Sequence, residues 1–179
     1  MPAGTGSALV MMTATPPLEN AVAGYVPPGE ERPLGSYAWL ASAYALALGG
    51  SLVALRAAGR ELPERPRMSD LLLAGIATHK SSRLLTKDKV ASFIRAPFTR
   101  YQESAGHGEV EEEPRGHGPR YALGELLVCP FCVAQWIASG FAVGLVAAPR
   151  GTRFIAGIFA VQTLADVLQL AYKAAEDRA

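Results

Sequence analysis

Uncharged apolar runs of membrane-spanning length dominate the pattern of this chain. The runs 37–55 and 130–148 contain no charged residue, and the run 152–172 contains only two. Because about 20 apolar residues cross the hydrocarbon core of a bilayer as a helix, each run predicts a transmembrane helix. Within the second run, Gly140 and Gly144 form a GxxxG step, which favours close packing against a neighbouring helix.

The segment 70–86 is a weaker candidate for a span. Ser69 and Asp70 provide a helix N-cap signal, and the helix that they predict is apolar as far as Ala77. Its second half is amphipathic, and one face carries polar side chains: His79, Ser82, Arg83 and Thr86. The bundle has four transmembrane helices if this polar face packs against other helices, and three if residues 70–86 are interfacial.

The remaining segments are polar. Residues 1–36 are rich in Pro, Gly and Ala without an apolar period, which predicts a disordered tail. The connection 87–121 is charged, and a short surface helix is expected within 90–98. The predicted fold class is therefore all-α, a small polytopic helical membrane bundle. Its expected parts are a disordered tail, an extra transmembrane helix, a membrane domain and a charged tail: 1–36, 37–56, 70–172 and 173–179.

The composition supports a membrane location, and the distribution of charge indicates how the chain is oriented in the membrane. Half of the 179 residues are hydrophobic and 18% are charged, against roughly 25% in soluble domains. The net charge of +1 gives no argument for nucleic acid. Lys and Arg collect in cytoplasmic loops. With residues 70–86 as a span, 11 of them lie inside and 6 outside; with residues 70–86 in the interface, 14 lie inside and 3 outside, so the charge rule alone prefers three spans. Both arrangements place the connection 87–121 and the C-terminus inside. We therefore expect a multi-pass protein of the bacterial inner membrane with 87–121 and the C-terminus in the cytoplasm. Its expected partners are the lipid bilayer and a membrane protein or a second copy of the chain.

Short motifs follow one another in a specific order along the second half of the chain. They are Lys80-x-x-Arg83-Leu84-Leu85, Asp88, Arg95-x-Pro97-Phe98, Gly124-Glu125-Leu126-Leu127, Cys129-x-x-Cys132 and Trp136. In this order they resemble the bacterial domain of unknown function 1360 family, the YjcA-like sporulation membrane proteins, over about residues 70–172. The usual family pattern has Arg at the position of Lys80 and Leu-Thr in place of Ser81-Ser82. The resemblance implies a small integral membrane protein with no assigned activity. It also favours four spans, because the shared core begins with the 70–86 helix.

The two cysteines of the chain form a CxxC motif where a membrane helix is expected to begin. A helix N-terminus favours the thiolate form of Cys, so Cys129 and Cys132 are candidates for redox chemistry. They are also candidates for metal binding, because structural Zn²⁺ takes four ligands and His107 and His117 could supply two more. The third interpretation is a structural role in the tight entry to the helix.

Polar side chains inside the predicted helices indicate one further site. Charged residues within membrane helices are rare, face the bundle interior and usually pair, so Arg83 and Asp166 are expected to form a buried pair. The other members of the predicted polar cluster are His79, Gln135, Gln162, Glu125 and Asp88. The cluster either holds the bundle together or forms a small site open to the cytoplasm.

The function predicted from the sequence is that of an uncharacterised, non-enzymatic integral membrane protein. It would act in envelope or sporulation-related assembly through its cytoplasmic face. A membrane thiol redox or metal-binding protein that uses the CxxC motif is the second hypothesis, and a small oligomeric transporter is the third. No catalytic residue is predicted, and Zn²⁺ is the one cofactor that the sequence suggests.

Overall fold

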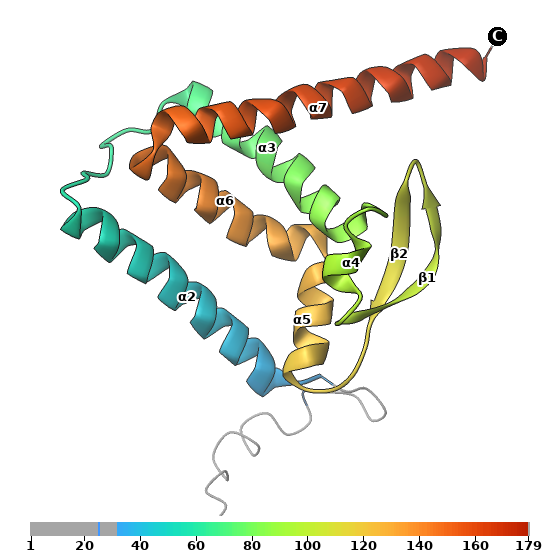
Figure 1. Cartoon of the computed structure of the whole chain (residues 1–179), viewed down its shortest axis with the longest axis horizontal. Helices are drawn as coiled ribbons and strands as arrows, with labels where there is room; N and C mark the ends of the chain where they lie inside the picture. The colour runs from blue at the N-terminus through green and yellow to red at the C-terminus, as the bar shows by residue number, and fades with distance from the viewer. Residues whose placement is uncertain (1–24, 26–31, 179) are drawn as a thin grey trace, which may run out of the picture. The chain divides into compact units, whose positions relative to one another are not determined.

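The computed structural model describes residues 25 and 32–178, so most of the predicted tail 1–36 lies outside the described residues. The chain divides into two units, Met1–Arg32 and Pro33–Ala179, and the second contains every element discussed here. In chain order these are α2 (Leu34–Ala57), α3 (Met68–Lys87), α4 (Ser92–Arg95), β1 (Thr99–Gly106), β2 (Glu109–Pro114), α5 (Pro119–Val128), α6 (Pro130–Ala147) and α7 (Pro149–Glu176) (Figure 1).

Three helices in the described part of the chain, α2, α6 and α7, are long and apolar enough to cross a membrane. They are the helices expected at 37–55, 130–148 and 152–172. Pro130 and Pro149 each occupy the start of their helix, where the missing N–H of proline costs no hydrogen bond. The helix expected at 70–86 is present as α3, but it is too polar to join these three by composition. Three apolar helices are consistent with a membrane protein, and a fourth span is not confirmed.

The all-α prediction is wrong for the connection 87–121. Strands β1 and β2 form an antiparallel two-stranded sheet. At the hairpin turn, Gly106, His107 and Gly108 have φ angles of 79°, 50° and 80°. Glycine adopts such positive angles without a steric cost, so the two glycines permit a tight reversal here. The short surface helix expected within 90–98 is present as α4.

The buried core of the helices lies where α3 meets α6 and α7. Ala77 of α3, Phe141 of α6 and Ala156 of α7 form one buried cluster, and the exposed fraction of Ala77 is 0%. Small side chains at such a crossing let the backbones approach closely. Gly144 has the same role, since a Cβ there would lie 2.7 Å from Oγ1 of Thr152 on α7.

Helix α5 packs against the base of the hairpin through a glycine. A Cβ atom on Gly124 would lie 2.5 Å from the carbonyl oxygen of Phe98 and 3.0 Å from Cβ of Pro114. Because a backbone carbonyl is one of these neighbours, a larger residue at this position would force the chain apart. The glycine of the Gly124-Glu125-Leu126-Leu127 motif is therefore required by packing.

Candidate functional site: the hairpin platform

Helix α3 carries basic side chains that bind the hairpin. Arg83 donates hydrogen bonds from Nε and Nη2 to the two carboxylate oxygens of Glu109. Lys87 Nζ lies 2.7 Å from Oε2 of Glu111. The two cations are one helical turn apart on α3, and the two carboxylates are two residues apart on β2, so each pair shares one face of its element. This match of spacings attaches β2 to α3. We call residues 88–128, which comprise α4, the hairpin and α5, the hairpin platform.

The expected pair of Arg83 with Asp166 is not formed. Asp166 on α7 instead accepts a hydrogen bond from Lys80, with 2.6 Å between Nζ and Oδ2. Arg83 lies three residues further along α3 and reaches Glu109, which the sequence placed in an irregular connection. The cation at position 80 therefore joins α3 to α7, and a second ion pair, Arg153–Asp70 at 2.7 Å, joins the same helices near their N-termini.

A further ion pair is buried inside the platform. The side chain of Arg95 is 0% exposed and that of Glu112 is 5% exposed. Nε and Nη2 of Arg95 donate to the two carboxylate oxygens of Glu112, each at 2.9 Å. The guanidinium also donates to the carbonyl oxygens of Leu85 at 2.8 Å and Asp88 at 3.1 Å. One arginine thus joins β2, α4 and the C-terminal end of α3 by charge-assisted hydrogen bonds.

The environment of Glu112 favours its charged form. Burial raises the pKa of Glu112. Hydrogen bonds from Arg95, from Thr99 Oγ1 at 2.7 Å and from Ser92 Oγ at 3.0 Å, together with the charge of Arg95, outweigh that effect. The pKa therefore lies below its ordinary value of 4.5. The carboxylate is held ionised at neutral pH as a structural counter-charge to Arg95.

The other members of the predicted polar cluster have separate contacts. Glu125 on α5 accepts a hydrogen bond from the hydroxyl of Tyr37 at the start of α2. Asp88 follows α3, and its Oδ1 accepts from the backbone N–H of Val90 at 2.7 Å. The remaining three members are exposed side chains on α3, α6 and α7: His79, Gln135 and Gln162.

The CxxC motif forms a disulfide between Cys129 and Cys132 at the start of α6. Cys129 is the N-cap of this helix, and its Sγ accepts the backbone N–H of Cys132 at 3.2 Å. In the disulfide form neither sulfur is a thiolate ligand. Within residues 25 and 32–178, no group of three or more His, Cys, Asp or Glu side chains is placed to hold a metal ion. His107 and His117 therefore do not complete a zinc site with the cysteines.

The sequence-based reasoning missed Glu112, Thr99 and Ser92 as partners of Arg95. Glu112 lies inside the acidic run 111–113, which has the character of a solvated loop. The available signal was the two-residue period of a strand, which places Glu112 on the same face as Val110, and Val110 is 3% exposed. An acidic side chain that shares a face with a buried valine needs a cation, and Arg95 provides it.

Comparison with known proteins covers the region that contains these contacts. The model of the family described as "Protein of unknown function (DUF1360)" matches residues 72–172. The sporulation protein YjcA of Bacillus subtilis (strain 168) is 26% identical over 102 residues, which cover 55% of this chain and 86% of the relative. No solved structure matches the chain. The family match extends from α3 to α7 and includes the whole platform, and the chain belongs to the DUF1360 family of proteins of unknown function.

Proposed function

We propose that this protein is a non-enzymatic, multi-pass protein of the bacterial inner membrane that acts in envelope or sporulation-related assembly. In this proposal α2, α3, α6 and α7 cross the bilayer, and the hairpin platform is the cytoplasmic surface that meets a partner. The observation that carries the proposal is a hairpin with an open strand edge that two ion pairs attach to α3.

The contacts of α3 support its role as a fourth span. Its 20 residues correspond to about 30 Å of helix, which equals the thickness of the hydrocarbon core. It packs against both α6 and α7. The charges that make it polar are paired, with Asp70 bound to Arg153 and Lys80 to Asp166. Paired charges that face neighbouring helices are the form in which membrane helices tolerate such residues.

The exposed strand supports the assembly role. In β1 every residue after Thr99 is exposed, and Tyr101 retains 63% of its accessible surface. Within the described residues the sheet has two strands, so the edge of β1 away from β2 is unpaired. The N–H and C=O groups of such an edge can pair with a strand of another chain. The partner expected here is therefore a protein that adds a strand to β1.

The orientation follows from the distribution of charge. The platform carries five Lys and Arg residues, against three in the segment between α2 and α3. Because the charge rule counts only Lys and Arg, it favours a platform on the cytoplasmic side. The cytoplasm keeps most thiols reduced, so with this orientation we expect Cys129 and Cys132 to be held as the dithiol in the cell. An extracytoplasmic platform would instead keep the disulfide permanently.

We expect cysteine labelling in whole cells to show four spans. In a Cys129→Ser/Cys132→Ser background, Arg65→Cys between α2 and α3 should react with an impermeant maleimide. Glu113→Cys in the platform should react only after the cells are opened. Both positions are exposed, so a difference in labelling reports the side of the membrane. Labelling of both from outside, or of neither, would contradict the four-span arrangement.

We also expect the exposed face of β1 to be required for function but not for folding. Tyr101→Ala combined with Glu103→Lys should accumulate in membranes within about twofold of the wild type, because exposed substitutions change stability by only about 0.5 kcal/mol. The double variant should fail to restore the phenotype of a deletion strain. Val90→Ala, which changes an exposed side chain of the platform outside β1, is the matched control and should restore it. Full restoration by the β1 variant would show that the exposed face of β1 is not the assembly surface.

A further inference from the structure

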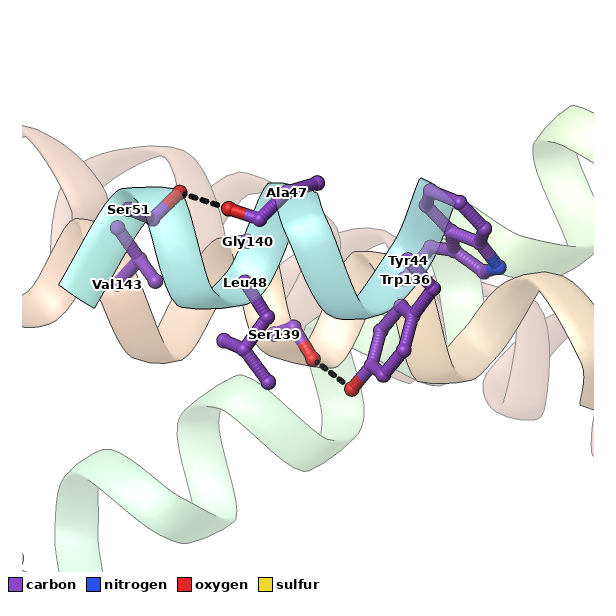
Figure 2. A pocket seen from close by; sticks show the side chains of 8 residues that line it. All are labelled: Tyr44, Ala47, Leu48, Ser51, Trp136, Ser139, Gly140 and Val143. Carbon is purple, nitrogen blue, oxygen red and sulfur yellow. Dashed lines mark hydrogen bonds between the residues drawn. The ribbon is translucent and has the colours of Figure 1, made fainter. Parts of the chain in front are cut away.

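Two cavities lie between α2 and α6, and a third adjoins them at the C-terminal end of α2. We call the three together the groove. The first has a volume of about 170 Å³ and is lined by both helices (Figure 2). The second, of about 390 Å³, shares Ser51 and Val143 with the first. The third, of about 510 Å³, shares Leu55 and Arg60 with the second. The shared residues place the three cavities next to one another along the C-terminal half of α2.

One end of the groove is closed by aromatic and hydroxyl side chains. The hydroxyl of Tyr44 lies 2.8 Å from Oγ of Ser139, and the Tyr44 and Trp136 rings meet edge to face with 5.2 Å between their centroids (Figure 2). Beyond this closure the walls are apolar or small, and a Cβ added at Gly140 would meet nothing within 4 Å. The middle of the groove is therefore an open apolar channel.

The other end of the groove is charged. Arg56, Arg60 and Glu61 all line the third cavity. The backbone that carries Arg60 is fixed, because Gly59 with φ of 67° donates to the carbonyl of Arg56 at 3.0 Å and the N–H of Arg60 donates to that of Leu55 at 2.9 Å. These two bonds form the Schellman ending of a helix. Two guanidinium groups and one carboxylate thus stand at the mouth of an apolar channel.

The dimensions of the groove limit the kind of ligand that it can bind. Along α2 the distance from Tyr44 to Ala58 is about 21 Å at the helical rise per residue, which exceeds the roughly 15 Å of one bilayer leaflet. The first cavity would hold only about one or two residues of a helix about 10 Å wide, so a second helix does not fit. A single acyl chain does fit, because it is narrow and apolar and starts at the charged surface of the leaflet.

We propose that this groove binds one glycerophospholipid with a primary-amine headgroup, of the phosphatidylethanolamine class. One acyl chain lies between α2 and α6, the phosphate lies at Arg60 and Arg56, and the ammonium lies at Glu61. Charge-assisted hydrogen bonds from guanidinium groups to phosphate provide the orientation. Glu61 selects against anionic headgroups, which it repels. The inference rests on the membrane placement of α2 and α6 in the proposed function.

Native mass spectrometry of the full-length protein in detergent, titrated with palmitoyl-oleoyl phosphatidylethanolamine, tests this site. The wild type should retain one lipid per chain. Gly140→Leu fills the channel and Arg60→Gln removes a phosphate ligand, and each should weaken retention about tenfold or more. Gly75→Leu, at a glycine on α3 that also has nothing within 4 Å, and Arg65→Gln are the matched controls and should retain the lipid. Glu61→Gln should shift the preference toward phosphatidylglycerol.

Three further results separate the possible outcomes. Glycerophosphoethanolamine, which has the headgroup without acyl chains, should not displace the lipid, and displacement would show a free phosphate site instead. Equal retention of ethanolamine, glycerol and choline lipids by all variants would show annular lipid only and would overturn the proposal. Membrane fractionation of Gly140→Leu distinguishes this failure from failure of the proposed function, because loss of lipid with normal membrane partition concerns the groove alone.

Discussion

Replacement of Arg95 by alanine is expected to lower the free energy of unfolding of the purified protein by about 3–5 kcal/mol, because it leaves the buried carboxylate of Glu112 without its partner. The carbonyl oxygens of Leu85 and Asp88 lose donors in the same step. Denaturant unfolding in detergent micelles, followed by near-ultraviolet circular dichroism, measures this loss of free energy. Arg100→Ala removes an exposed arginine from β1 and should change stability by less than about 0.5 kcal/mol.

Two further variants separate the charge pair from the packing around it. Arg95→Met with Glu112→Leu should recover much of the lost stability, because two apolar side chains avoid both desolvation costs. A double variant no more stable than Arg95→Ala would show that the two residues do not act as a pair.

Glu112 also predicts a pH dependence of stability. Its pKa is depressed in the folded protein, so the stability that it contributes is fully present above the ordinary value of 4.5 and is lost as the pH falls through the folded pKa. Glu112→Gln should be less stable at pH 7 and should lack this loss of stability in acid.

Breaking the ion pair between α3 and α7 is expected to have the second-largest effect, with an asymmetry between its partners. Lys80→Met leaves Asp166 charged in an apolar helix, at a cost of about 2.5–3.5 kcal/mol on the scale for membrane insertion. Asp166→Leu should cost less, because the long side chain of Lys80 can extend toward the headgroups. Both single variants should lower membrane accumulation, which quantitative immunoblotting of membrane fractions measures.

The double variant Lys80→Met/Asp166→Leu should accumulate nearly as well as the wild type, because neither charge remains in the apolar region. Arg83→Ala is the internal control. Its side chain is 43% exposed and pairs with Glu109, so the loss should be below about 1 kcal/mol. If Arg83→Ala were the more damaging change, the pairing of Lys80 with Asp166 would not be the contact that holds α3 to α7.

The sequence by itself determined the features that depend on residues close together along the chain. The runs 37–55 and 130–148 identified helices α2 and α6, because the free energy of placing a helix in lipid depends on its own side chains. The same holds for the start of α6 at Pro130, since the absent N–H of proline is a property of that residue. The order of short motifs identified the family, which the match over residues 72–172 confirmed.

Only the tertiary structure decided which charged groups meet. Glutamates are poor strand formers in isolation, so the local signal for β2 in 109–113 is weak and consists of Val110 and the two-residue period that places Glu112 on its face. That strand is stabilised by Arg83, Lys87 and Arg95, which lie 14 or more residues away in the sequence. With β2 in this position, Arg83 pairs with Glu109 and Lys80 pairs with Asp166. A charge on a helix face indicates that a partner is needed, but the partner is chosen by distances between elements that the chain brings together only when it folds.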